Sequence, residues 1–88
     1  MKKYMICYDL LKPGKDYEPL IARLKQWGAN KILYSQWVLR TEQNAVQIRD
    51  DLKKFIDGND RLLVSGLTGE AAWTSLISSA EDFKSKIA

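Results

Sequence analysis

Short runs of hydrophobic residues alternate along the chain with segments of helical periodicity. The first run, KYMICYD at residues 3–9, is rich in strand-forming residues and too short for a free-standing helix. Two similar runs, KILY at 31–34 and WVLR at 37–40, are joined at Ser35-Gln36 and predict a tight hairpin or one long bent strand pair. The run RLLVSGLT at 61–68 predicts a fourth strand.

Two segments between these runs have the spacing of amphipathic helices. Apolar residues form one stripe between residues 17 and 27, with Asp16 as the expected N-cap and Gly28 as the expected stop. A second helix is expected to begin after Thr41 or Asn44, either of which is a good capping residue. The sequence therefore alternates strand, helix, strand, strand, helix, strand.

This order is the split β-α-β pattern of a ferredoxin-like sandwich. It predicts an α+β fold with a four-stranded antiparallel sheet, the first and third strands in its centre and both helices on one face. We assign this domain to residues 1–70. Residues 71–88 are then a C-terminal extension, expected to be extended around Trp73 and to form a short helix from about Ser79 to Lys86.

The sheet face opposite the two helices is also expected to be apolar, which favours a homodimer. In the first strand Tyr4, Ile6 and Tyr8 alternate with Met5 and Cys7, so both faces are hydrophobic. Soluble monomers avoid a large exposed patch of this kind. We expect two copies to pack through this face, with the C-terminal extension reaching the partner. The alternative is that the extension folds back over its own sheet.

Size and composition support oligomerisation and exclude some chemistries. A chain of 88 residues has a thin stability margin, and one cysteine with no histidine permits neither an internal disulfide nor a Cys/His zinc site. Any metal would be a hard cation bound by oxygen atoms. The net charge of +3 permits contact with nucleic acid without requiring it. No segment has the length of a membrane span and we recognise no export signal, so we expect a cytoplasmic protein.

Asp9 is the best candidate for a chemical role. It ends a central strand and precedes a loop carrying Lys12 and Lys15. Its carboxylate could bind Mg²⁺ while the two lysines contact phosphate, and a two-fold axis nearby would supply a second carboxylate from the partner. The alternative is that Asp9 is an ordinary turn-forming residue.

Other polar residues are weaker candidates. Lys12, Lys15, Lys31 and Arg40 could form a basic rim that contacts a phosphate backbone, or could be ordinary surface charge. Ser35 has no histidine base, so a catalytic triad is excluded.

Several segments resemble the SinR-like small proteins, which are grouped with the CRISPR-associated Cas-two proteins and are similar in fold to VapD-type ribonucleases. The resemblance covers about residues 1–73. Its more specific parts are the Tyr-Asp ending of the first strand and the Ser-Gln-Trp-Val segment. The similar stretches are YMICYDL, the Pro-Gly turn, the Trp-Gly helix end, LYSQWVLR, IRDDL and NDRLLVSGLTGEAAW.

The resemblance implies a ferredoxin-like homodimer in which Asp9 of each chain binds Mg²⁺ for cleavage of RNA or DNA. It also implies that Tyr8 and the Ser35 region line the same cleft. Other members of the family do not cleave nucleic acid and act as scaffolds. The sequence therefore leaves three functions open: a metal-dependent endonuclease, a non-catalytic dimeric module that binds nucleic acid or protein, and a regulatory module that binds a small ligand.

Overall fold

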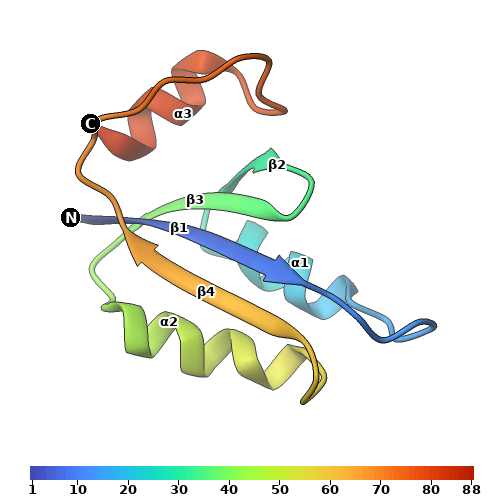
Figure 1. Cartoon of the computed structure of the whole chain (residues 1–88). Coiled ribbons are helices and arrows are strands. Elements are labelled where there is room, and N and C mark those ends of the chain that lie inside the picture. The colour runs from blue at the N-terminus through green and yellow to red at the C-terminus, as the bar shows by residue number, and fades with distance from the viewer.

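A four-stranded antiparallel sheet and three α-helices make up the computed structural model, which describes residues 1–88 (Figure 1). The strands are β1 (Lys2–Asp9), β2 (Asn30–Leu33), β3 (Gln36–Thr41) and β4 (Arg61–Gly66). The helices are α1 (Glu18–Gln26), α2 (Ala45–Leu52) and α3 (Ala80–Ile87), and a 3-10 turn, η1 (Lys53–Phe55), follows α2. The strand order β2-β3-β1-β4 confirms that β1 and β3 are central.

The ends of the elements differ slightly from the prediction. Asp16 is not the N-cap of α1; Tyr17 occupies that position, and Asp16 Oδ1 instead accepts a bond from the Glu18 N–H (2.9 Å). Asn44, and not Thr41, caps α2, because it forms a reciprocal capping box with Gln47 (2.8 Å for each bond). Side-chain chemistry alone could not decide between these capping residues.

The hairpin and the last strand are also displaced from their predicted positions. The turn of the β2–β3 hairpin lies at Tyr34-Ser35 and not at Ser35-Gln36, because β3 already begins at Gln36. A bulge between Lys31 and Leu33 shifts the register of β2 against β3. β4 ends at Gly66, two residues before the predicted end.

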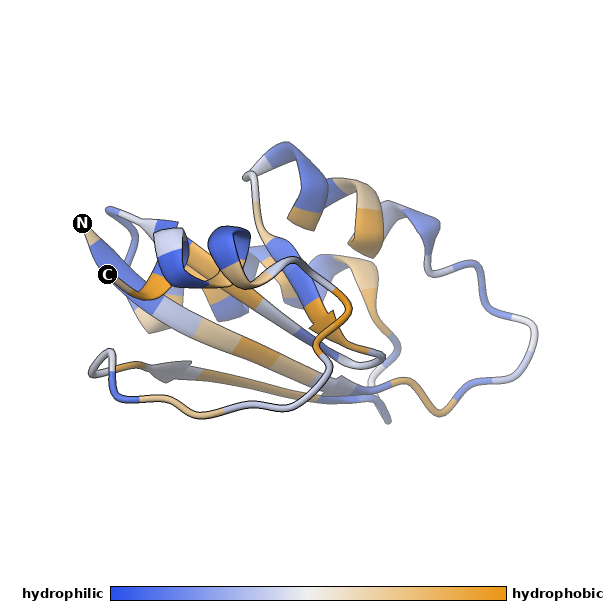
Figure 2. Ribbon diagram, turned by 90° about the horizontal axis from the view of Figure 1, so that it is seen from above, coloured by the Kyte–Doolittle hydropathy of each residue, from blue (hydrophilic) through white to orange (hydrophobic).

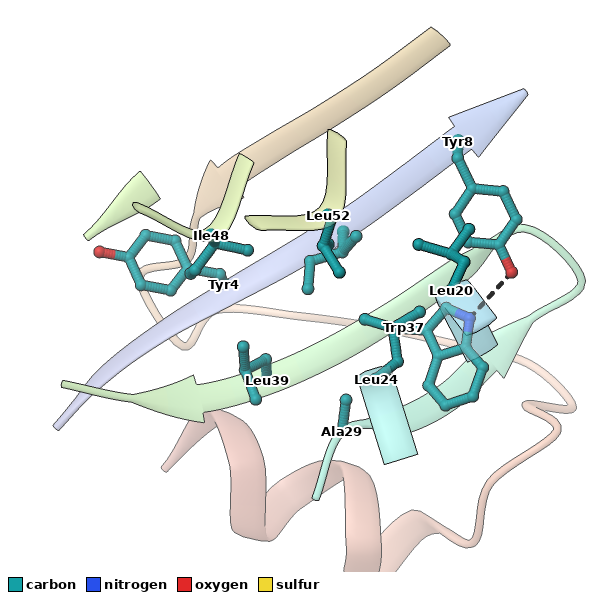
Figure 3. Packing of buried hydrophobic residues seen from close by; sticks show 10 residues of the cluster. Tyr4, Tyr8, Leu20, Leu24, Ala29, Trp37, Leu39, Ile48 and Leu52 are labelled. Carbon is teal, nitrogen blue, oxygen red and sulfur yellow. Dashed lines mark hydrogen bonds between the residues drawn. The ribbon is translucent and has the colours of Figure 1, made fainter. Parts of the chain in front are cut away.

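One face of the sheet is covered by α1 and α2. Tyr4, Ile6 and Tyr8 of β1 point to this face and meet Leu20 and other buried residues (Figure 3). The remaining members of the buried cluster are Leu24, Ala29, Trp37, Leu39, Ile48 and Leu52. Figure 2 shows hydrophobic stretches along the strands and on the helix sides that face them. The two amphipathic stripes in the sequence thus form the main core.

The opposite face is partly covered by the chain's own C-terminal extension. Phe83 and Ile87 of α3 pack with Ile32 and Val38 in a second buried cluster. Trp73 lies edge-on to Phe83, with ring centroids 5.0 Å apart. The alternative we considered for the extension is therefore the one observed: it folds back on its own sheet.

Two basic side chains hold the end of α3 against the sheet. Lys3 Nζ donates to the Ile87 carbonyl (2.6 Å), and Arg40 Nη1 donates to the Ser85 carbonyl (3.1 Å). The last carbonyls of a helix lack internal partners and carry a partial negative charge, so cations there are stabilising. Arg40, predicted as part of a basic rim, instead anchors α3.

α3 covers the sheet over β2 and β3, and Met5 of β1 packs against the same cluster, but the rest of this face of β1 and β4 is open (Figure 1). We call the residues on this uncovered side the open strip; they are Cys7, Leu63 and Ser65. Leu63 is 59% exposed, whereas Cys7 is intermediate. The homodimer remains a prediction, but the apolar surface available to it is narrower than the sequence indicated.

None of the helices is long and apolar enough to cross a membrane.

Replacing Phe83 with alanine should lower the free energy of unfolding by about 3 kcal/mol, because a buried aromatic ring leaves a cavity between α3 and the sheet. Chemical denaturation followed by circular dichroism measures this change. Ile77→Ala is the matched control, since Ile77 is an exposed apolar residue of the same extension, and its effect should stay within about 0.5 kcal/mol. Equal effects of the two substitutions would contradict the docking of α3.

Candidate functional site

A shallow hollow of about 310 Å³ lies where β1 ends. Its wall is formed by the end of β1, the β2–β3 turn and the start of β4, and it opens on the same side as the open strip. The side chains and backbone that line it come from Cys7, Tyr8, Asp9, Ser35, Gln36, Arg61, Leu62 and Leu63. Three of the predicted site residues, Tyr8, Asp9 and Ser35, are thus brought together here.

Asp9 is paired with a cation of its own chain. It lies opposite Arg61 in the β1–β4 register, and Arg61 Nη1 is 3.5 Å from Asp9 Oδ2. Both side chains are mostly exposed, with relative exposures of 61% and 72%, so the pair is hydrated and contributes little to stability. Within the site, the pair places a cation beside the carboxylate of Asp9.

Tyr8 contributes to the hollow through its backbone, while its ring faces the other way. Its N–H donates to the Ser35 carbonyl (3.1 Å), which holds the β2–β3 turn beside β1. Its ring is buried under the helices, where the hydroxyl accepts a bond from Trp37 Nε1 (3.0 Å; Figure 3). Tyr8 therefore supports the site and the core, and its ring is not presented to a ligand in this structure.

Lys12 and Lys15 do not line the hollow. Lys12 Nζ pairs with Asp57 Oδ1 (3.3 Å), and Lys15 Nζ lies 5.9 Å from the centre of the Tyr17 ring. Lys31, predicted on the same rim, lies 6.0 Å from the centre of the Tyr34 ring. The structure does not gather the predicted basic residues into one surface around Asp9.

A carboxylate network that the sequence analysis missed fixes the loop after β1. Asp60 accepts bonds from the Leu11 N–H (2.7 Å), the Tyr17 hydroxyl (2.7 Å) and the Asp57 N–H (2.8 Å). These bonds tie the β1–α1 loop to the loop before β4. The sequence DGND at 57–60 signalled a turn, but its long-range partners could not be read from local spacing.

These hydrogen bonds and the Lys12–Asp57 pair lower the pKa values of the Asp57 and Asp60 carboxyl groups. Burial raises the pKa of Asp60, but bonds from Leu11, Tyr17 and Asp57 outweigh it and the net shift is downward. Bonds from the Asn59 N–H and from Lys12 lower the pKa of Asp57. Both groups are therefore stabilised in their charged forms.

The residues of one chain do not form a complete Mg²⁺ site. Asp9 is the only carboxylate that lines the hollow, and no cluster of three or more acidic, histidine or cysteine residues could hold a metal. Mg²⁺ in proteins is bound by one or two carboxylates with waters and substrate phosphates, and Arg61 competes for the carboxylate present. Cys7 adds no reactive group, because burial raises the pKa of its thiol.

No family model matches the sequence, and no solved structure matches the fold.

Replacing Tyr8 with phenylalanine should lower the free energy of unfolding by about 1–3 kcal/mol, because the buried Trp37 N–H loses its acceptor. Urea denaturation measures the change. Tyr34→Phe is the matched control, since Tyr34 is 86% exposed, and it should have no measurable effect. An unchanged stability in Tyr8→Phe would show that the bond contributes nothing.

The Asp57–Asp60 network should make stability depend on acid. In the folded protein the pKa values of Asp57 and Asp60 are lowered from the ordinary 3.8, so on acidification the unfolded chain binds protons first. The stabilisation from these two carboxylates is therefore present above about pH 4 and is lost as the pH falls through their folded-state pKa values. Thermal unfolding should show Tm falling below about pH 4, and Asp60→Asn should flatten this part of the profile.

Tyr17→Phe removes one donor to Asp60 and should flatten the same part of the profile to a lesser degree. Tyr34→Phe should keep the wild-type profile. Equal acid slopes in wild type and Asp60→Asn would contradict the role of the network.

Proposed function

We propose that this chain is a ferredoxin-like homodimeric module that binds a protein partner without catalysing a reaction. The element order and the placement of α1 and α2 on one face support the ferredoxin-like assignment. The resemblance to SinR-like proteins, whose Cas-two relatives include non-cleaving scaffolds, is consistent with it. Of the three functions that the sequence leaves open, the proposal adopts the non-catalytic dimeric module.

The observation that carries the proposal is the pairing of Asp9 with Arg61. A hydrolytic metal site needs carboxylates free to bind the ion, and the hollow offers a single one, with the Arg61 guanidinium beside it. The hollow also has no histidine and no activated thiol that could act as a base or nucleophile. Binding a protein partner requires neither a metal site nor a catalytic base or nucleophile.

Charge favours a protein partner over nucleic acid. The end of β1, the β1–α1 loop and the segment leading into β4 carry three cations and four carboxylates: Lys12, Lys15 and Arg61 against Asp9, Asp16, Asp57 and Asp60. Two of the cations are paired internally, Lys12 with Asp57 and Arg61 with Asp9. Binding to a phosphate backbone depends on free cations, whereas contact with a protein surface does not.

A Mg²⁺-dependent endonuclease acting on RNA or DNA is the second candidate. It is favoured by the exposure of Asp9 at the end of a central strand, in a hollow shared with Ser35. It requires a second chain to bring another Asp9 close to the first.

A cleavage assay separates the two candidates. Purified protein should not cleave single- or double-stranded RNA or DNA with Mg²⁺ or Mn²⁺, and its affinity for these nucleic acids should be no tighter than about 100 µM at physiological salt. Gel electrophoresis and fluorescence anisotropy measure the two quantities.

Metal-dependent cleavage would establish the endonuclease instead, if Asp9→Ala abolished it. Asp16→Ala is the matched control, because it removes the same side chain from the neighbouring loop outside the hollow.

A further inference from the structure

The two edges of the sheet are protected to different degrees. At the β2 edge, the strand has four residues, a bulge interrupts its register, and the Ile77 N–H donates to the Ile32 carbonyl (2.9 Å). β4 at the other edge has six residues in unbroken register with β1. It has no proline, and its single charge is Arg61 at its start. Proteins normally protect such an edge with charges, prolines or bulges.

The free hydrogen-bonding groups of β4 belong to its even-numbered residues. The Leu67 N–H donates to the Lys3 carbonyl (2.9 Å), and antiparallel strands alternate between bonded and non-bonded pairs. In the observed register, Leu63 and Ser65 therefore bond to β1. The N–H and C=O groups of Leu62 and Val64 point away from β1, toward the open edge.

Apolar side chains flank this edge on both faces. Leu63 lies on the open strip and is mostly exposed. On the helix face, a groove of about 230 Å³ runs between α2 and β4, and the exposed Val46 lies on its wall beside Leu62 and Val64. An added strand would therefore gain apolar contacts as well as backbone bonds.

We propose that β4 pairs antiparallel with β4 of a second copy about a two-fold axis through Leu63, so that two sheets become one. In this register Leu63 faces the partner's Leu63 as a non-bonded pair, the type with the closer side chains. Leu62 faces the partner's Val64, and these two residues exchange backbone bonds. The proposal rests on the homodimer proposed above and specifies its interface.

The sequence of β4 is complementary to itself in this register. Arg61 lies opposite the partner's Ser65, so no like charges oppose one another. Moving the axis to Val64 would place Leu63 opposite the partner's Ser65 and Leu62 opposite the partner's Gly66, with less apolar contact. This complementarity selects a second copy as the occupant.

The proposed dimer keeps the two Asp9 residues apart. Each lies on β1, so three strand spacings, about 14 Å, separate the two β1 strands. It differs in this respect from a dimer that packs face to face, and it accords with binding without catalysis.

Sedimentation of the full chain across a concentration series tests the interface. Wild type should be dimeric, Leu63→Glu and Leu63→Lys should each weaken dimerisation at least about tenfold through like charges at the axis, and an equimolar mixture of the two should restore it. Leu33→Glu is the matched control, because it places the same charge at an exposed leucine on the β2 edge, and it should leave the dimer intact.

Amide hydrogen exchange of the wild type provides a measurement independent of any substitution. The Leu62 and Val64 amides should become more protected as concentration rises, and circular dichroism should show both Leu63 variants folded.

A monomeric wild type at about 100 µM would overturn this interface and the proposed homodimer together. A dimer that Leu63→Glu leaves unchanged, with fast exchange at Leu62 and Val64, would overturn only the β4 interface. Weakening by both variants without recovery on mixing would overturn the axis at Leu63. If the chain formed a complex through β4 only with a different protein, and not with a second copy, the β4 edge would be assigned to that protein instead. Metal-dependent cleavage would refute the proposed function, whereas sedimentation of the Leu63 variants and exchange at Leu62 and Val64 report on the β4 interface directly.

Discussion

The structure depends on covering both faces of β1. This central strand carries apolar side chains in both directions, so a single layer of helices cannot remove it from water. α1 and α2 cover one side, and α3 returns from the end of the chain to cover part of the other. In a chain of this size every layer matters, because the fraction of surface buried on folding is small.

The same requirement explains why the architecture could be predicted. The short apolar run of residues 3–9 and the helical stripes around Leu24 and Ile48 are local signals that predict the elements, and the order of the elements predicts the central positions of β1 and β3. The path of the extension depended on contacts distant in sequence, such as Lys3 with Ile87. No local pattern distinguishes an apolar face covered by α3 from one covered by a second molecule.

The candidate site was predicted with less success for a related reason. The resemblance implied that Asp9 and the Ser35 region line one cleft, and both residues line the hollow at the end of β1. Which cation accompanies which carboxylate depends on register and loop path. The Asp9–Arg61 pair follows from the β1–β4 register, and the Lys12–Asp57 pair from the way two loops are tied together. Lysines near an aspartate in sequence were not its partners in space.

The bond from the Ile77 amide to the Ile32 carbonyl also limits stoichiometry. A sheet with two bare edges can recruit neighbours on both sides and polymerise into an open filament. Here one side is already closed by the chain itself, so lateral growth can proceed in one direction only and terminates after a single addition. The C-terminal extension adds no strand to the sheet, but by covering the β2 edge it limits edge-to-edge pairing to a finite assembly and prevents a fibre.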